Sequence, residues 1–220
     1  MPTAPYYVGE GKDKKRVPGV TTVLSRFKES GGLMHWAWDL GMQGINYRDV
    51  RDKAASTGSI CHDMIEEFIH GRSEVEAESY VSAPPEDQKR AGQGFDAFHE
   101  WWNDSKIELL DTEMHIVSEE FRFGGTPDAV GRDSQGRFVL LDWKTSNNTY
   151  LEYIIQLAAY DHLVTLKYEQ PARTHLLRVG KDFADFHHHS WPRDVIDRAF
   201  SSFRQMRWLY DELAVLKKLV

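Results

Sequence analysis

The feature that most constrains the fold of this chain is an apolar run ending in two charges, RFVLLDWK at residues 137–144. Such a run is typical of a strand that is buried on both faces in the middle of a sheet. Because side chains alternate along a strand, Asp142 and Lys144 are predicted to point to one face, about 7 Å apart. Both charges are costly to bury unless they are paired or used. The run therefore indicates either a structural ion pair or a functional site.

A second carboxylate lies one hairpin upstream. The stretch FGGTPDAV at residues 123–130 places Asp128 in the preceding strand, and DSQG at 133–136 is a turn signal. Antiparallel pairing brings Asp128 and Asp142 together, where they repel unless a proton or a cation lies between them. A hard divalent cation is the natural occupant. Gly124 and Gly125 indicate either close approach of a backbone or substrate, or a kinked strand.

The rest of the chain predicts helices on both sides of this sheet. Strand patterns cover residues 114–118, 121–130, 137–144, 172–179 and 183–189, and helix patterns cover 20–28, 33–42, 46–55, 58–70, 86–105, 150–166 and 194–218. Residues 74–85 read as a linker, Thr57 as the cap of the helix at 58–70, and Gly71 as its end. We therefore expect an α/β fold, a central mixed β-sheet flanked by helices.

Two predicted helices carry polar pairs at a spacing of four residues. His62 and Glu66 lie together at the edge of the apolar face of the helix at 58–70, one turn apart. Gln156 and Tyr160 stand among apolar residues in the helix at 150–166, where buried polar groups need partners. Each pair either has a structural role or points into a functional site. The presence of the carboxylates of Asp128 and Asp142 favours a functional site.

These motifs together resemble a known family. Pro127-Asp128 followed by Asp142-Trp143-Lys144 looks like the signature of the PD-(D/E)XK nuclease superfamily. His62 in TGSICHDMIEEF, then GGTPD, LLDWKTS and QLAAY, are similar in order and spacing to the RecB-type, λ-exonuclease-like group of phage, bacterial and mitochondrial exonucleases. The resemblance covers about residues 17–165. It implies a restriction-endonuclease-like core in one nuclease domain over 1–220, with an N-terminal segment at 1–57, a catalytic core at 58–190 and a C-terminal helix at 191–220.

The resemblance also implies roles for individual residues. Asp128, Asp142 and His62 would ligate Mg²⁺ or Mn²⁺, helped by the backbone carbonyl of Trp143. Lys144 would position or deprotonate the attacking water. Supporting or substrate-binding roles are implied for Glu66, Glu120, Thr145, Ser146, Gln156 and Tyr160. The only cysteine is Cys61, which excludes the relatives that hold an iron–sulfur cluster with four cysteines.

The activity that the resemblance implies is metal-dependent hydrolysis of DNA phosphodiester bonds. We expect an exonuclease acting on single-stranded or end-containing DNA, in recombination, repair or replication, with an oligomer or a recombination partner left open. One alternative is a non-catalytic nucleic-acid-binding or scaffold subunit, which the intact Asp128, Asp142 and Lys144 disfavour. Another is a phosphoesterase acting on small substrates.

The charge of the chain is unevenly distributed. The formal net charge is −7, yet residues 66–120 carry −11 and the remainder carries +4. The acidic helix at 86–105 is therefore predicted to face away from DNA. No apolar run approaches the roughly 20 residues that span a bilayer, and the N-terminus has no apolar signal core. A cytoplasmic setting, in a bacterial cell or a phage-infected host, is the expectation.

Several further features are interpreted as structural. The histidines at 187–189 alternate faces on a predicted strand, so at most two of them share a ligand. The tryptophans at 36, 38, 101 and 102 are read as core residues of helices rather than stacking platforms for bases. The basic residues at 12–16 are equally consistent with a solvated tail and with contacts to phosphates.

Overall fold

A five-stranded sheet forms the centre of the molecule. The computed structural model describes residues 4–28, 31–180 and 186–219. The strands are ordered β3-β6-β7-β8-β9, and only the β7–β8 pair is parallel. Their bounds are Glu108–Thr112 (β3), Ala129–Arg132 (β6), Phe138–Thr145 (β7), Arg173–Val179 (β8) and Phe186–His189 (β9). The predicted mixed sheet is confirmed, and residues 183–185 of the expected last strand lie outside the described residues.

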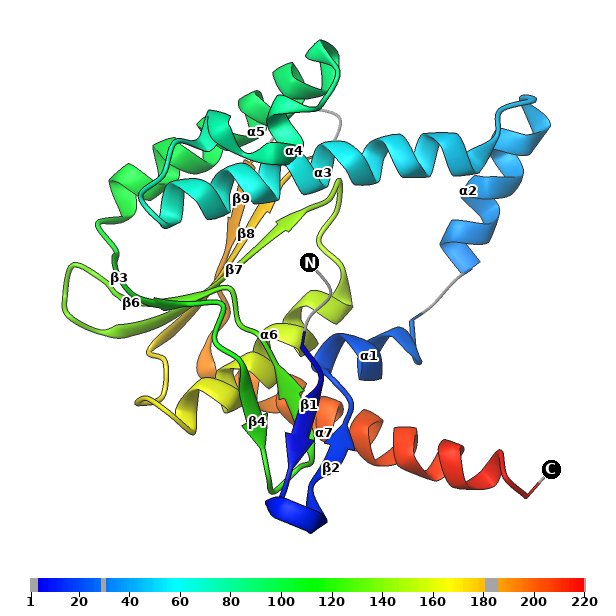
Figure 1. The fold of residues 1–220 in the computed structure, drawn as a ribbon, viewed down its shortest axis with the longest axis vertical. Helices are drawn as coiled ribbons and strands as arrows, with labels where there is room; N and C mark the ends of the chain where they lie inside the picture. The colour runs from blue at the N-terminus through cyan, green and yellow to red at the C-terminus, as the bar shows by residue number, and fades with distance from the viewer. Residues whose placement is uncertain (1–3, 29–30, 181–185, 220) are drawn as a thin grey trace.

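Helices cover both faces of this sheet. Helices α3 (Tyr47–Ile69) and α5 (Pro85–Ser105) lie on one face, and α6 (Leu151–Thr165) and α7 (Arg193–Leu216) lie on the other (Figure 1). Two separate hydrophobic clusters fill the two layers, with Leu140 in the cluster on the α6 side and Leu141 in the cluster on the α3 side. Burial on both faces explains why β7 reads as a continuous apolar run.

The hairpin between β6 and β7 forms as the sequence predicts. The carboxylate of Asp133 accepts hydrogen bonds from the backbone N–H groups of Gln135 (2.9 Å) and Arg137 (3.0 Å), and Gly136 has a φ of +73°. The antiparallel register pairs Ala129 with Leu141. This register places Asp128, one residue before Ala129, beside Asp142.

The expected strand at 121–130 is wrong, because the chain changes sheets within it. Strand β5 (Phe123–Gly125) pairs with β4 (Ile116–Ser118) in a separate two-stranded sheet, and β6 begins only at Ala129. Pro127, which lies between them, has no N–H to donate to a ladder. No strand was predicted for the residues of β3, because this edge strand has mixed exposure and shows no clear alternation of apolar and polar residues.

The N-terminal half is more helical than expected. Helix α3 is continuous across the two predicted helices at 46–55 and 58–70, so the expected boundary at residue 57 falls inside it. The side chain of Asn46 caps this helix by accepting the N–H of Arg48 at 3.1 Å, whereas Thr57 is buried within it. Gly71, at a φ of +72°, follows the end of the helix as predicted. The expected linker contains a 3₁₀ turn (Glu74–Glu76) and α4 (Glu78–Val81).

Smaller elements complete the molecule. A hairpin of β1 (Tyr6–Val8) and β2 (Lys15–Val17), with a 3₁₀ turn (Gly11–Asp13) at its tip, precedes α1 (Val20–Ser25) and α2 (Gly31–Met42). Among the described helices, none is both long and apolar enough to cross a membrane.

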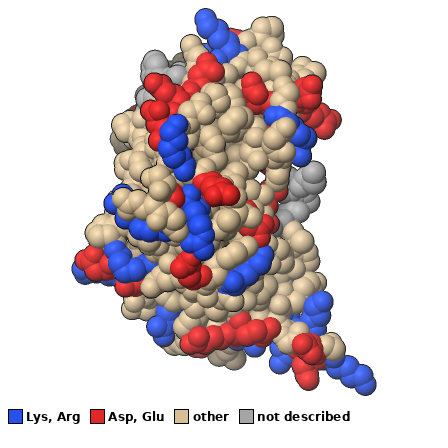
Figure 2. Space-filling model, turned by 90° about the vertical axis from the view of Figure 1, so that its left-hand side faces the viewer, with Lys and Arg blue, Asp and Glu red and all other residues tan. Residues whose placement is uncertain are grey.

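Charged side chains are interspersed on the side of the molecule that Figure 2 shows. Lys and Arg alternate there with Asp and Glu, and neither sign forms a continuous field.

Candidate active site

Two carboxylates meet where β6 begins and β7 approaches its end. The Oδ2 atom of Asp128 accepts the backbone N–H of Trp143 at 3.0 Å, which fixes this carboxylate against β7. Asp142 is only 1% exposed, and its Oδ1 atom accepts no hydrogen bond from any described residue. A buried carboxylate oxygen without a donor is unusual and indicates a place for a proton or a cation.

Lys144 supplies the positive charge nearest to this pair. Its Nζ atom lies 2.7 Å from Oδ2 of Asp142, on the same side of β7, as the alternation predicts. Burial acts to lower the pKa of Lys144, but the charges of Asp142 and Asp128 outweigh it and raise the pKa above its usual value. The ammonium group is therefore held in its charged form.

The two carboxyl groups are correspondingly hard to ionise. Burial, together with the charge of Asp128, raises the pKa of Asp142 to about 7, although Lys144 opposes the shift. Burial also raises the pKa of Asp128, and Glu113 adds to this, while Lys144 and the N–H of Trp143 lower it. A positive charge added beside the pair would favour ionisation of both.

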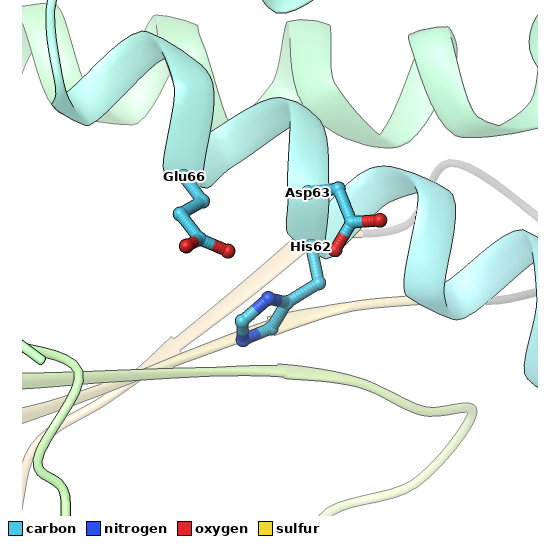
Figure 3. Close-up of side chains that lie close together, drawn as sticks. All are labelled: His62, Asp63 and Glu66. Carbon is cyan, nitrogen blue, oxygen red and sulfur yellow. The ribbon is translucent and has the colours of Figure 1, made fainter. Parts of the chain in front are cut away.

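Helix α3 brings a second group of ligand atoms over the sheet. One nitrogen of His62 and one carboxylate oxygen each of Asp63 and Glu66 lie within 4.8 Å of one another. Figure 3 shows His62 and Glu66 pointing from the helix toward the strands, with Asp63 at the side. Burial and then Lys144 lower the pKa of His62, so its imidazole is neutral and offers a lone pair.

Glu113 is a site residue that sequence reasoning missed. Its carboxylate, that of Glu66 and the imidazole of His70 form another group of ligand atoms within 4.8 Å. The backbone N–H of Glu113 donates to the carbonyl of Asp128 at 2.9 Å, and its φ is +48°. No periodic pattern marks Glu113, because it reaches the site through a left-handed turn after β3 rather than along a strand or a helix.

The structure gathers only part of the predicted ligand set. Asp128, Asp142 and Lys144 are together, but His62, Asp128 and Asp142 do not all lie within 4.8 Å of one another among the described residues. His62 packs against the ring of Trp143, with centroids 5.9 Å apart, on the α3 face of β7. Asp142 points to the opposite face by alternation. His62 and Asp142 therefore approach the end of β7 from two sides.

The donor set fits a divalent cation. It consists of carboxylate oxygens from Asp128 just before β6, from β7, from α3 and from the turn after β3, together with the neutral imidazole of His62; the β7 carboxylate includes the buried oxygen without a hydrogen bond. Oxygen donors suit hard divalent cations.

Gln156 and Tyr160 form a buried pair on α6, close enough to Lys144 for Tyr160 to affect its pKa. The side-chain amide of Gln156 donates to the hydroxyl of Tyr160 at 2.9 Å, and both residues are buried. Burial raises the pKa of Tyr160, so its phenol stays protonated. The ring lies against Gly125, where a Cβ would come within 2.7 Å of both Tyr160 and Leu163. The glycine thus makes room for this tyrosine.

The remaining predicted residues have different surroundings. Ser146 is held in the loop after β7: its hydroxyl donates to the carbonyl of Asn148 at 2.8 Å, and its own carbonyl accepts from Arg178 at 2.6 Å. Thr145 is half-buried at the end of β7. Glu120 is exposed in the turn between β4 and β5, near His162, and does not share a strand with Asp128. The alternation that linked Glu120 to Asp128 fails because the strand is interrupted.

A mixed sheet with acidic residues and a lysine at one strand end defines the class of protein, a nuclease of the restriction-endonuclease-like type. A family model described as the PD-(D/E)XK nuclease superfamily matches residues 37–213. The chain belongs to this superfamily, which confirms the resemblance of its motifs. No curated protein matches the sequence significantly.

The solved structures that are similar to this chain match it at low identity and low TM-score. A "putative exonuclease" from Eubacterium rectale is 12% identical, with a TM-score of 0.48, over 68% of this chain and 64% of that one. The chain thus spans less than two thirds of the length of that protein. An alkaline exonuclease from Laribacter hongkongensis is 14% identical, with a TM-score of 0.35, over 74% of this chain and 92% of that one.

Proposed function

We propose that this nuclease hydrolyses DNA with Mg²⁺ or Mn²⁺, acting as an exonuclease on ends or single strands in recombination, repair or replication. The observation that carries the proposal is the trio of Asp128, Asp142 and Lys144, in which the buried carboxylate of Asp142 and the half-buried one of Asp128 lie near one ammonium group. Such a trio has a use in phosphodiester hydrolysis, which needs a cation and a donor at the phosphoryl group.

Asp128 and Asp142 would hold the cation, with His62, Glu66 and the backbone carbonyl of Trp143 as further ligands from either side. A divalent cation supplies polarisation of a phosphoryl oxygen and activation of a water molecule. The N–H of Trp143 orients Asp128 for this role, and burial by α6 excludes bulk water from Asp142.

Lys144 acts as a hydrogen-bond donor in this proposal. Because the neighbouring carboxylates raise its pKa, the ammonium group keeps its protons and is a poor base. It can orient the attacking water and stabilise the negative charge that develops on the phosphoryl oxygens. Of the two roles suggested for Lys144 by the resemblance, positioning is therefore the one that its surroundings favour.

The test is hydrolysis of end-labelled linear DNA and of closed circles, each with Mg²⁺ or Mn²⁺. Asp142→Asn and Lys144→Met should each lower the rate by at least about 100-fold, while Glu108→Gln, at an exposed position of β3, should leave it unchanged. Cleavage of closed circles would instead indicate an endonuclease. DNA binding without divalent-metal binding would favour the scaffold alternative, and absence of activity on any DNA or RNA would exclude the nuclease.

A further inference from the structure

A polar cavity of about 490 Å³ lies apart from the carboxylates, where the N-terminal hairpin meets α1 and α7. These elements lie together beside the β4–β5 sheet (Figure 1). The wall of the cavity contains Arg16 from β2, Arg122 from the turn before β5, and Arg207 and Asp211 from α7. Its size is that of a small-molecule or nucleotide site.

Arg207 forms the buried part of this wall. The residue is 5% exposed; its Nε atom donates to the carbonyl of Arg122 at 2.9 Å, and its Nη1 atom lies 2.7 Å from the carboxylate of Asp211. The other terminal nitrogen, Nη2, has no hydrogen bond or ion pair within the described residues. A guanidinium group that is held rigidly and retains a free N–H edge is preorganised to receive an anion.

Two further cations at the cavity are unpaired. Arg16 and Arg122 are exposed, and neither side chain makes an ion pair or a hydrogen bond in the part of the chain that the structure describes. Asp211 is the only acidic residue in the lining. Three guanidinium groups and one carboxylate give a local charge of about +2 in a protein whose net charge is negative. Planar guanidinium forks match the geometry of a phosphate group.

The cavity is connected to the active site through β5. Gly19, in the cavity lining, forms a β-bridge with Gly124, and the backbone N–H of Gly124 donates to the carbonyl of Pro18 at 3.1 Å. Tyr6, also in the lining, shares a hydrogen bond of 2.9 Å with the hydroxyl of Thr126. Asp128 follows two residues later, at most about 7 Å along the backbone. The backbone beside the cavity therefore leads within a few residues to the segment that carries Asp128.

We propose that the cavity binds a backbone phosphate of the nucleic-acid substrate, at a nucleotide away from the bond that is cut. The inference rests on the proposed function, because it takes the strand held by Asp128 and Asp142 as the source of the phosphate. Arg207 supplies the fixed guanidinium, and Arg16 and Arg122 close around the bound phosphate. The cavity thereby holds the strand in place without contacting the reacting atoms.

The experiment measures binding separately from hydrolysis. Single-stranded oligonucleotides of increasing length are titrated against the full chain carrying Asp142→Asn, with and without Arg16→Gln and Arg122→Gln together. The matched control carries Lys89→Gln and Lys106→Gln, two exposed cations on or next to α5; Lys106 has the same φ of 54° as Arg122. Arg207 is left unchanged because its buried contacts hold α7 to the turn before β5.

The arginine pair should weaken binding at least tenfold for the longer oligonucleotides and leave the shortest ones unaffected. The slope of log affinity against log salt concentration should fall by about 0.7, the value for one single-strand phosphate contact. Affinity and slope equal to those of the lysine control would overturn the proposal. Arginine-dependent binding of adenosine monophosphate, with unchanged oligonucleotide affinity, would assign the cavity to a free nucleotide and overturn it as well. Neither result would affect the nuclease, whose own test is cleavage by the unaltered chain.

Discussion

At the scale of single residues, the active site is dominated by charges that lack full compensation. Burial, and then the charge of Asp128, raise the pKa of Asp142 to about 7 although the ammonium group of Lys144 opposes the shift. Replacing Lys144 by Met would leave these carboxylates without their cation, so loss of charge compensation and loss of catalysis would occur together. For this reason, metal binding is better tested with a residue that lies beside these charges than with one of them.

Glu113 offers such a test. Its carboxylate lies with those of α3 and acts on the pKa values of both Asp128 and Glu66. Glu113→Gln should raise the divalent-metal concentration needed for half-maximal cleavage by about 10- to 100-fold, the range for groups that orient metal ligands. The rate at saturating metal should change less. An equal metal requirement in Glu113→Gln and the control Glu108→Gln would show that Glu113 has no part in metal binding.

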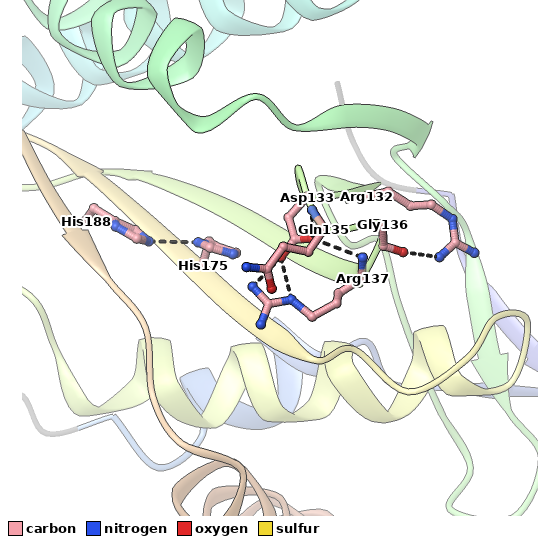
Figure 4. Close-up of polar contacts among 7 residues, drawn as sticks. All are labelled: Arg132, Asp133, Gln135, Gly136, Arg137, His175 and His188. Atoms are coloured by element: carbon pink, nitrogen blue, oxygen red, sulfur yellow. Dashed lines mark hydrogen bonds and ion pairs between the residues drawn. The ribbon is translucent and has the colours of Figure 1, made fainter.

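A second residue-scale prediction concerns stability. His175 in β8 and His188 in β9 share a hydrogen bond of 2.8 Å, beside the hairpin turn of residues 132–137 (Figure 4). Burial, followed by the charges of His188 and Arg173, lowers the pKa of His175 from 6.5 to about 4. Between these two pH values, the unfolded chain binds more protons at this position than the folded chain does. The free energy of unfolding therefore falls as the pH decreases.

Between pH 6.5 and pH 4, the titration of His175 is expected to lower the free energy of unfolding by about 3 kcal/mol. Urea unfolding at a series of pH values measures it. His175→Asn, which removes the titrating group, should flatten the pH dependence, and His35→Asn, at an exposed position of α2, should not. The same dependence in both variants would contradict the assignment to His175.

At the scale of elements, the position of β5 depends on glycines that admit side chains from two sides. A Cβ at Gly124 would lie 2.1 Å from the ring of Tyr6, and a Cβ at Gly125 would lie 2.7 Å from Tyr160. The N-terminal hairpin and α6 thus both pack against β5. The sequence left open whether Gly124 and Gly125 allow a backbone or a substrate to approach, or kink the strand. In the structure, the groups that approach these glycines are side chains of the chain itself.

Gly124→Ala should therefore displace Tyr6 and lower the free energy of unfolding by about 1–3 kcal/mol, the usual cost of overpacking. Gly92→Ala is the matched control, because a Cβ at this position in α5 meets nothing within 4 Å. That change should raise stability by up to about 1 kcal/mol. Urea denaturation distinguishes the two, and equal stabilities would show that the contact with Tyr6 is not required.

At the scale of the whole molecule, the acidic residues of the segment at 66–120 lie in two different kinds of place. Glu66 and Glu113 lie in a group of candidate ligand atoms, whereas Asp96, Glu100 and Asp104 are exposed at successive turns of α5. Because these residues lie in different places, the net charge of the segment does not correspond to one acidic surface. The basic residues that matter most for the proposals are also few and local: Lys144 at the carboxylates, and Arg16, Arg122 and Arg207 at the cavity.

Reversing the exposed α5 charges with Asp96→Lys, Glu100→Lys and Asp104→Lys should leave DNA binding intact, because this face of α5 is predicted to point away from the substrate. The removal of Arg16 and Arg122 should weaken binding even though it changes fewer charges. Fluorescence anisotropy with the Asp142→Asn chain measures both. Abolished binding in the α5 variant would contradict the predicted orientation.

The sequence by itself determined the central part of the site. The buried strand, the DSQG turn and the side-by-side placement of Asp128 and Asp142 follow from alternation and a short hairpin. The i,i+4 spacing likewise placed Gln156 and Tyr160 on one face of their helix, although their hydrogen bond to each other was not predicted. These features are local, since each depends on residues close in sequence and on the geometry of one hairpin or one helix.

Only the tertiary structure decided the rest. The interruption of the strand before Asp128, the left-handed turn that delivers Glu113, and the meeting of Arg16, Arg122 and Arg207 leave no periodic signal. The physical reason is that they depend on contacts between residues far apart in the chain, with Tyr6 against Gly124 and Arg207 against the carbonyl of Arg122. Alternation and helical spacing predict which side chains share a face, but packing determines which faces meet.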